Sequence, residues 1–361
     1  MNRFELPPHQ DTAAAWFGPA MGANGSWLET LTPDEVDELG ACSAGLLESG
    51  TDFGQLRAPD LVLPRLAPRL QRILQEVQDG RGFVLLRGLP VQRWGRRQSA
   101  VAFMVIGAHL GAARPQNAMG HILGHVRDMG LHSSDPSVRI FQTSERQTFH
   151  TDSCDIVALL CLQPARSGGQ SALVSSTTLF NVMRRRRPDL ARVLFEPVAT
   201  DRRGEVPPGQ QAFFTIPVLN WWPHGARGQL SAIYQRQYID SAQRFADAPR
   251  LTPAHHQALD FFDALANDPA LHFLMDLAPG DIQFVNNHTL LHDRTAFDDW
   301  SQRERRRHLL RLWLAPKPAR ALPPVYAQRY GSVVSGERGG ICLPTAQLNV
   351  PWDGLQESSP A

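Results

Sequence analysis

Short apolar runs follow one another from about residue 137 onwards, and no other feature of the sequence limits the fold as strongly. Glycines, prolines and polar residues separate the runs. Short strands at such intervals are typical of a β-sandwich or barrel. We therefore predict a mainly β protein with peripheral helices and a core of the jelly-roll kind. The runs are VRIFQT, DIVALLCL, SALVSS, FFTIPVL, LSAIYQ, DIQFVNN and HLLRLWL.

Helical patterns surround this core. Thr32, followed by Pro33 and acidic residues, predicts the start of a helix. Leucines at helical spacing from Leu63 onwards predict a second helix that stops at Gly80. No linker divides the chain. We predict N-terminal helical decoration (1–80), a jelly-roll catalytic domain with helical insertions (81–335) and a C-terminal extension (336–361).

Composition excludes several classes of partner. The 361 residues carry a formal net charge of +1, which gives no field for nucleic acid or an acidic membrane surface. No apolar run approaches the roughly 18 residues of a membrane span. The four cysteines are scattered, as is usual for reduced thiols. We expect a cytoplasmic protein that acts on a small molecule, without nucleic-acid or membrane partners, and leave a homodimer open.

The triplet His150-Thr151-Asp152 places an imidazole and a carboxylate two residues apart, at what looks like the start of a strand. Alternate side chains of a strand share a face, so the two would form a hydrogen-bonded pair or bind one metal ion. Histidines recur downstream at His288 and His292. Two histidines and one carboxylate are the ligand set of non-haem Fe(II) oxygenases.

A later strand carries two arginines, Arg307 and Arg311, on one face of an otherwise apolar run. Burying both would be costly without an anion to pair with them. The sequence therefore predicts a carboxylate-binding site beside the candidate metal ligands.

Four motifs in this order resemble the taurine dioxygenase (TauD/TfdA) superfamily of Fe(II)- and 2-oxoglutarate-dependent oxygenases. They are FHTDSCD (149–155), SGGQSALVSS (167–176), NNHTLLHDRTAF (286–297) and RHLLRLWL (307–314), and the resemblance spans roughly residues 80–330. It implies a double-stranded β-helix (jelly-roll) core of the clavaminate synthase-like type. It also implies that His150, Asp152 and His292 bind iron and that His288 does not.

The resemblance implies further that Arg307 and Arg311 hold the carboxylates of 2-oxoglutarate. We expect divided labour between them, with Arg311 on the C5 carboxylate. The family has a threonine after a Gly-Gly-Asp turn, where this chain has Gln170 and then Ser171. A serine hydroxyl can make the same hydrogen bond to the cosubstrate. Such an enzyme consumes O2, releases succinate and CO2, and most often hydroxylates a C–H bond.

Two other functions stay open. One is a non-catalytic jelly-roll protein that binds metal or 2-oxoglutarate, and the other is a desaturase or ring-forming member of the family. Gln116, Asn117 and His121 precede the metal motif and are candidates to line the substrate pocket. His121 and His125 would share a face on a helix, which leaves a second metal site open. The sequence does not identify the substrate.

Overall fold

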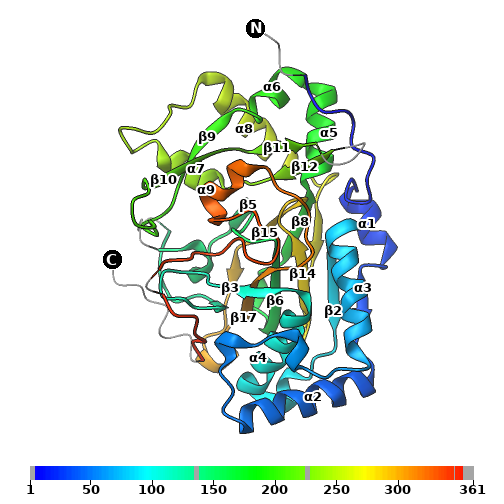
Figure 1. Cartoon of the computed structure of the whole chain (residues 1–361). Coiled ribbons are helices and arrows are strands. Elements are labelled where there is room, and N and C mark those ends of the chain that lie inside the picture. The colour runs from blue at the N-terminus through cyan, green and yellow to red at the C-terminus, as the bar shows by residue number, and fades with distance from the viewer. Residues whose placement is uncertain (1–4, 134–137, 224–227, 345, 353–361) are drawn as a thin grey trace.

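Two β-sheets form the centre of the protein in the computed structural model, which describes residues 5–133, 138–223, 228–344 and 346–352 (Figure 1). The larger sheet has the strand order β1-β2-β14-β6-β17-β3, and β4 also pairs with β17. Its strands are β1 (Leu28–Thr30), β2 (Phe83–Arg87), β14 (Ile282–Asn286), β6 (Ile156–Gln163), β17 (His308–Ala315), β3 (Ala112–Arg114) and β4 (Leu123–Val126). All its pairings are antiparallel except β1 with β2.

The smaller sheet has the order β13-β8-β15-β5 and carries the candidate metal residues. Its strands are β13 (Phe273–Met275), β8 (Ser171–Ser175), β15 (Leu290–Arg294) and β5 (Gln147–His150). Three two-stranded pairs complete the β structure: β9 (Pro197–Asp201) with β10 (Phe213–Pro217), β11 (Leu219–Trp222) with β12 (Gln229–Ala232), and β7 (Ser167–Gly168) with β16 (Phe297–Asp298).

Helices lie at both ends of the sheets, with α2 and α4 at one end and α5, α6 and α8 at the other (Figure 1). The α-helices are α1 (Gly18–Asn24), α2 (Pro33–Glu48), α3 (Leu66–Asp79), α4 (Val91–Leu110), α5 (Ser176–Arg186), α6 (Pro188–Val193), α7 (Arg236–Ala242), α8 (Pro253–Ala266) and α9 (Ala327–Tyr330). Short 3-10 turns span Phe53–Gln55, Ala58–Asp60, Ile140–Gln142, Arg303–Arg305 and Pro324–Tyr326.

The local signals of the sequence explain where the first helices begin and end. Thr32 caps α2 through a capping box with Glu35, as its sequence predicts. Helix α3 ends at Gly80, and its leucines pack against the large sheet in the main apolar cluster. Helix α4 differs from the predicted peripheral helices, because Phe103 and most of its second half are completely buried.

The central strands β14 and β17 are buried along their whole length. A strand covered on both faces reads as a continuous apolar run, which is why these two were easy to predict. Six of the seven predicted runs contain a strand, whereas VRIFQT is wrong because Ile140–Gln142 forms a 3-10 turn. The helix considered around His121 and His125 is also wrong, since Leu123–Val126 is strand β4.

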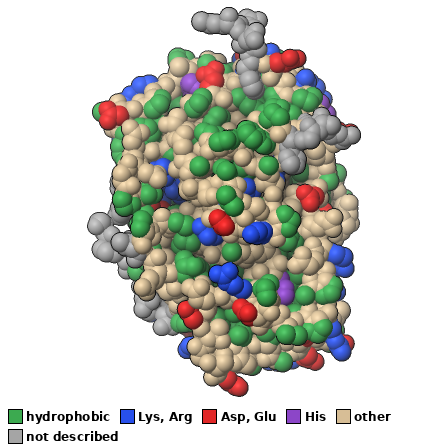
Figure 2. Space-filling view, viewed as in Figure 1, with side chains coloured by type: hydrophobic (Ala, Val, Ile, Leu, Met, Phe, Trp, Pro, Cys, Tyr) green, Lys and Arg blue, Asp and Glu red, His purple; other side chains and the backbone are tan. Residues whose placement is uncertain are grey.

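The C-terminal segment returns to the large sheet and to the turn after β5. Gly340 donates its backbone N–H to Ser153 O over 2.7 Å, and Ile341 donates to Pro115 O over 2.8 Å. On the surface, Figure 2 shows basic side chains near the middle of one face, with acidic side chains among them. No helix in the described ranges is long and apolar enough to cross a membrane.

Candidate active site

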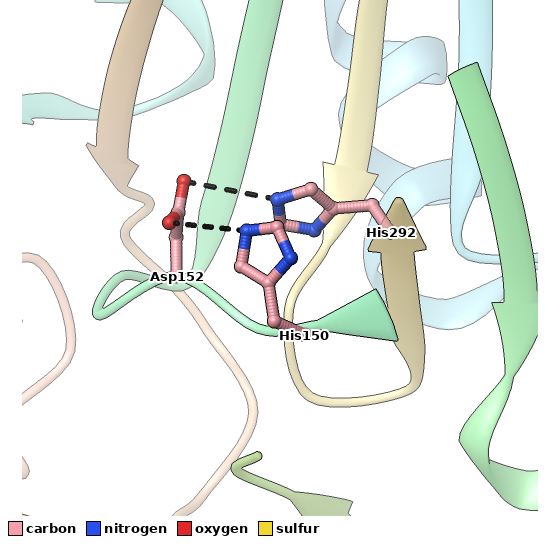
Figure 3. Close-up of side chains that lie close together, drawn as sticks. All are labelled: His150, Asp152 and His292. Atoms are coloured by element: carbon pink, nitrogen blue, oxygen red, sulfur yellow. Dashed lines mark ion pairs between the residues drawn. The ribbon is translucent and has the colours of Figure 1, made fainter. Parts of the chain in front are cut away.

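Three side chains converge where β5 ends. His150 is the last residue of β5, Asp152 lies in the turn that follows, and His292 lies on β15 (Figure 3). His150 and His292 are direct partners across the two strands. One potential ligand atom of each residue lies within 4.8 Å of the others, and all three are buried. The triplet thus ends a strand and does not begin one.

The hydrogen bonds of His150 orient it for metal binding. Its Nδ1 lies 2.8 Å from Thr148 O, and a carbonyl oxygen can only accept, so Nδ1 carries the proton. Nε2 is then an acceptor, to which the Gln147 amide donates over 2.9 Å. The Nε2 atoms of His150 and His292 each lie 3.9 Å from an Asp152 oxygen. A lone pair on Nε2 is what a metal ion requires of histidine.

Asp152 is held by three residues from two segments of the chain. Its Oδ2 accepts from Trp313 Nε1 over 2.8 Å and from Arg311 Nη1 over 3.3 Å, both on β17. Its backbone N–H donates to Asn287 Oδ1 over 3.0 Å. The sequence places Trp313 on the same strand face as Arg311, two residues away, but predicts no role for it.

The charge states also fit a metal ion. Burial lowers the pKa of His150, and burial next to His150 lowers the pKa of His292 to about 3. Burial alone would raise the pKa of Asp152, but Arg311 and the two histidines reverse this and lower it. Two neutral imidazoles and one carboxylate are the protonation states that metal ligands need. These residues therefore fit a divalent cation.

A small cavity lies on one side of the cluster. His150, His292, Ser171, Arg307 and Arg311 all line it, so both arginines face the same space as the sequence predicts. Ser171 is buried and shares hydrogen bonds of 2.9 to 3.1 Å with Gln283.

Two buried cations in this cavity lack an ion-pair partner in the described part of the chain. Nη1 of Arg307 and Nε of Arg294 are buried without a hydrogen-bond partner. Burial lowers the pKa of Arg307 to about 10 and, with Arg307 as neighbour, that of Arg294 to about 9. Arg311 differs, because its Nε donates to Gln116 Oε1 over 2.8 Å and its Nη1 to Asp152. An anion in the cavity would offset the cost of burying Arg294 and Arg307.

A larger cavity of about 590 Å³ adjoins the cluster, and His150 and Asp152 form part of its wall. Gln116, Asn117 and His121 line it too. The Gln116 amide donates to Ile122 O and Arg311 O over 3.0 and 2.9 Å, so this residue also positions Arg311. The two cavities thus meet at the cluster, where His150 and Arg311 line both.

Comparisons with known proteins agree with this arrangement. The profile of the family described as "Taurine catabolism dioxygenase TauD, TfdA family" matches residues 47–313. The chain belongs to this family. It is 31% identical over 303 residues to FR-33289 synthase of Streptomyces rubellomurinus, covering 82% of this chain and 87% of that protein. It is 29% identical over 310 residues to the taurine hydroxylase-like protein SAT17 of Stachybotrys chartarum, covering 82% of this chain and 77% of that protein.

Solved structures share the fold. An asparagine oxygenase in complex with Fe(II), 3-hydroxyasparagine and succinate matches with a TM-score of 0.60 at 16% identity, over 80% of this chain and 93% of that one. The non-haem iron oxygenase OrfP in complex with Fe, succinate and (3S)-hydroxy-L-Arg matches with a TM-score of 0.59 at 18% identity, over 80% of this chain and 94% of that one. The chain is an Fe(II)- and 2-oxoglutarate-dependent dioxygenase of the TauD/TfdA family. The predicted family, enzyme class and cofactors are confirmed.

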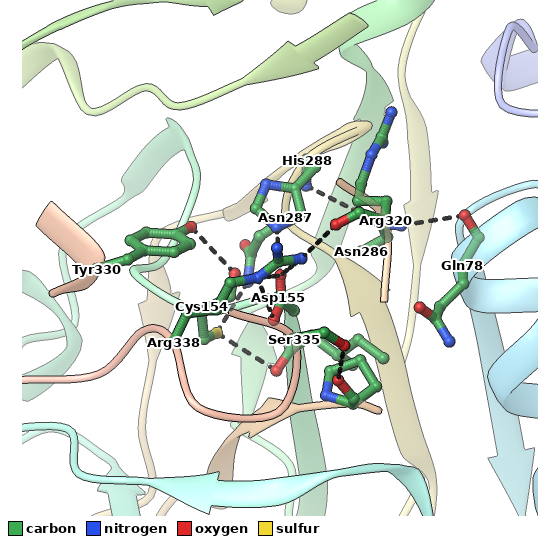
Figure 4. A network of polar contacts seen from close by, with 12 residues as sticks. Gln78, Cys154, Asp155, Asn286, Asn287, His288, Arg320, Tyr330, Ser335 and Arg338 are labelled. Atoms are coloured by element: carbon green, nitrogen blue, oxygen red, sulfur yellow. Dashed lines mark hydrogen bonds and ion pairs between the residues drawn. The ribbon is translucent and has the colours of Figure 1, made fainter. Parts of the chain in front are cut away.

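In this protein, His288 lies apart from the cluster of His150, Asp152 and His292. Its Nε2 donates to Asp155 Oδ1 over 2.7 Å, and the Arg338 guanidinium pairs with the same carboxylate over 2.8 Å (Figure 4). All three side chains are buried. His288 therefore takes part in an ion network that ties the turn after Asp152 to the C-terminal segment. Arg338 lies in the predicted extension, and no sequence signal marked it.

His125 also lies outside the site. Its Nδ1 is 2.8 Å from His308 Nε2, and its own Nε2 donates to Pro351 O over 2.6 Å. Among the described residues, only His150, Asp152 and His292 form a cluster that could hold a metal ion, so no carboxylate or thiol joins the His125–His308 pair in one. His121 bonds to Asn117 over 3.0 Å instead. The two histidines that a helix would have aligned have different partners.

Proposed function

We propose that this dioxygenase hydroxylates a C–H bond of a small organic substrate, with His150, Asp152 and His292 as its iron ligands. The convergence of one ligand atom from each, within 4.8 Å, carries the proposal. Iron, once bound by these three residues with 2-oxoglutarate, supplies the oxidation chemistry and leaves succinate and CO2. The chain itself supplies position, charge and the exclusion of water.

The small cavity suits 2-oxoglutarate. Arg307 has a buried Nη1 without a partner, whereas Arg311 is occupied by Gln116 and Asp152. An arginine fork binds a carboxylate through two parallel hydrogen bonds only if its nitrogens are free. We therefore assign the C5 carboxylate to Arg307, and Arg311 to the C1 end beside the ligands. This assignment reverses the preference for Arg311 drawn from the sequence.

Ser171 is placed to assist Arg307. It lines the same cavity, and Gln283 fixes its hydroxyl. The turn before Ser171 requires glycine, because its backbone lies close to that of Ala296. Gly168 has φ 71°, and a Cβ there would lie 2.3 Å from Ala296 O. The proposal gives the Ser171 hydroxyl a hydrogen bond to the cosubstrate carboxylate.

The large cavity is the proposed substrate pocket, with Asn117 and His121 in its wall and Gln116 between the wall and Arg311. The names of similar proteins support a small polar substrate. A relative from Amycolatopsis, 30% identical over 186 residues that cover 49% of this chain and 64% of that protein, is a uridine-5'-phosphate dioxygenase. The asparagine oxygenase and OrfP complexes hold hydroxylated amino acids.

The finer description of the fold belongs to the same proposal. The two facing sheets, with ligands at the end of β5 and on β15, support a double-stranded β-helix of the clavaminate synthase-like type. We also keep the division into helical decoration (1–80), catalytic domain (81–335) and C-terminal extension (336–361). A cytoplasmic location, the absence of nucleic-acid and membrane partners, and a homodimer stay sequence-based predictions.

An anaerobic titration tests the function. Purified protein is titrated with Fe(II) and then 2-oxoglutarate, and a metal-to-ligand charge-transfer band is followed. Air is then admitted, and succinate and candidate products are quantified across a panel of small molecules. A band, succinate and a hydroxylated product are expected. A band without succinate would instead favour the non-catalytic binding protein, and an unsaturated or cyclised product would favour a desaturase or ring-forming enzyme.

A further inference from the structure

Arginines are concentrated in the wall of the large cavity. Two carboxylates, Asp152 and Glu205, line it with them. A third carboxylate, Asp201, is buried directly behind the wall. The arginines that line the cavity are Arg139, Arg203, Arg244, Arg311 and Arg329. Among the described residues, five arginines of the wall thus lie near three carboxylates.

Asp152 and Glu205 pair with two of these arginines. Arg311 pairs with Asp152 over 3.3 Å. Arg139 pairs with Glu205 over 2.9 Å, and its Nη1 donates to the Tyr238 hydroxyl over 2.9 Å. Of the three carboxylates, Asp201 remains to pair with the other arginines of the cavity.

Asp201 serves two arginines at once. Arg244 lies 2.6 Å from its Oδ2, and Arg203 lies 3.9 Å from the same atom. Ser241 also donates to Oδ2 over 2.6 Å, so this carboxylate is fully engaged. Arg244 takes the close contact.

Arg329 has no ion-pair partner within the described residues. Its Nε donates to Ser153 Oγ over 2.7 Å, and its guanidinium lies over the Phe214 ring at 5.6 Å from the centroid. This hydrogen bond uses only one edge of the guanidinium, which leaves the terminal amino groups for the cavity. Two parallel N–H donors in one plane match the two oxygens of a carboxylate or phosphate group.

The position of Arg329 relates it to the reaction. Its hydrogen-bond partner Ser153 directly follows the proposed iron ligand Asp152 in the chain. A ligand held by Arg329 therefore lies in the same cavity as Asp152 and His150. Burial lowers the pKa of Arg329, which shows that its charge loses solvation in the cavity wall. A bound anion would stabilise the buried charge of Arg329 in place of the lost water.

We propose that Arg329 is the anion-binding residue of the substrate cavity, and that the substrate carries an oxyanion, either a carboxylate or a phosphate or phosphonate group. The proposal rests on the proposed function, because it uses the same cavity as the substrate pocket. It adds the chemical class of the substrate and the residue that selects it. Arg329 lies on α9, beyond the last residue that the family profile matches.

Calorimetric titration of the full chain, loaded anaerobically with Fe(II) and 2-oxoglutarate, tests the proposal. The probes are methylphosphonate and acetate, which represent the two oxyanion classes. Arg329→Gln removes the charge, and Arg329→Lys keeps it without the fork. Arg187→Gln is the matched control, because it removes an exposed arginine that pairs with Asp189 and lines neither cavity.

The wild type should bind at least one probe, and the preferred probe identifies the class of oxyanion. Arg329→Gln should weaken that binding about 10- to 100-fold, the range for a hydrogen bond to a charged group. The affinity of Arg329→Lys should lie between those of the wild type and Arg329→Gln, and that of Arg187→Gln should stay within about twofold of the wild type. Failure of the wild type to bind either probe, or equal losses in Arg329→Gln and Arg187→Gln, would overturn the proposal.

The charge-transfer band, recorded on the same samples, separates this proposal from the proposed function. A wild type that forms the band but binds neither probe refutes the anion site alone. A wild type that forms no band refutes the iron and cosubstrate assignment, while calorimetry still scores the binding of the two probes. Thermal melting of each variant identifies any loss of binding that comes from unfolding.

Discussion

Trp313 donates its indole N–H to Oδ2 of Asp152 over 2.8 Å, and so fixes the carboxylate of the proposed iron site. Trp313→Phe keeps the ring but removes this donor. Loss of such an outer partner typically costs about 10- to 100-fold in metal affinity. We expect a loss of that size in an anaerobic Fe(II) titration. Trp94→Phe, in the packing around α2 and α4, is the control. Equal Fe(II) affinity in both variants would show that the hydrogen bond is not needed.

His292 and His288 should behave in opposite ways. His292→Ala removes one of three proposed ligands and should abolish stoichiometric iron and succinate formation. His288→Ala removes the donor to Asp155 in a buried network and should cost about 1 to 3 kcal/mol of unfolding free energy, with iron retained. Metal analysis and urea unfolding of both variants check this. If His288→Ala lost its iron and His292→Ala kept it, the third ligand would be His288 and not His292.

Arg307 and Arg311 should affect different kinetic constants. Arg307→Lys loses the fork proposed for the C5 carboxylate, so the KM for 2-oxoglutarate should rise by about 10-fold or more, as for a charge-assisted hydrogen bond. Arg311→Lys disturbs Asp152 and Gln116 and should act on kcat and on coupling instead. Steady-state succinate assays separate the two. The assignment fails if the KM rises in Arg311→Lys alone.

Asn117 and His121 are predicted to act on the substrate and not on the cosubstrate. Both line the large cavity and neither lines the small one. Their alanine variants should keep 2-oxoglutarate turnover while the ratio of product to succinate falls. The ratio is measured once a substrate has been found in the panel. A wild-type ratio in both variants would remove this segment from the substrate pocket.

The buried pair His125 and His308 should make the protein less stable in acid. Burial lowers the pKa of His125 to about 4 and that of His308 to about 2, with Arg96 and Arg127 adding repulsion. Both rings are neutral in the folded state. Their contribution to stability is therefore complete above the unfolded pKa of about 6.5 and is lost as the pH falls below it.

Each of these histidines should remove about 1.4 kcal/mol of unfolding free energy per pH unit below that value. Urea unfolding at pH 7 and pH 5 measures this loss together with that of the other buried histidines. In His125→Gln, the amide can still donate to Pro351 O and accept from His308, but it does not titrate. The loss between the two pH values should be smaller in this variant. An unchanged loss would place the acid sensitivity elsewhere.

The sequence was most informative where a pattern is local. The capping box at Thr32, the buried runs of β14 and β17 and the ordered family motifs could all be read directly, because each depends on residues close in the chain. VRIFQT failed because its short apolar run cannot distinguish a strand from a 3-10 turn at Ile140–Gln142.

Long-range partners could not be read in this way. Arg338 meets Asp155 across 183 residues, and Arg329 meets Ser153 across 176. Neither residue stands in a motif, and one arginine among many carries no positional signal. The division between Arg307 and Arg311 also escaped the sequence, since it depends on Gln116, which approaches Arg311 from 195 residues away.

The contacts of the C-terminal segment set the order in which the site can form during synthesis. The nascent chain presents His150 and Asp152 long before His292 leaves the ribosome. The turn behind Asp152 then still lacks Arg338 and Gly340, which hold Asp155 and Ser153. The proposed iron site therefore has its complete set of supporting contacts only after residues 338–340 have been translated and have reached this turn.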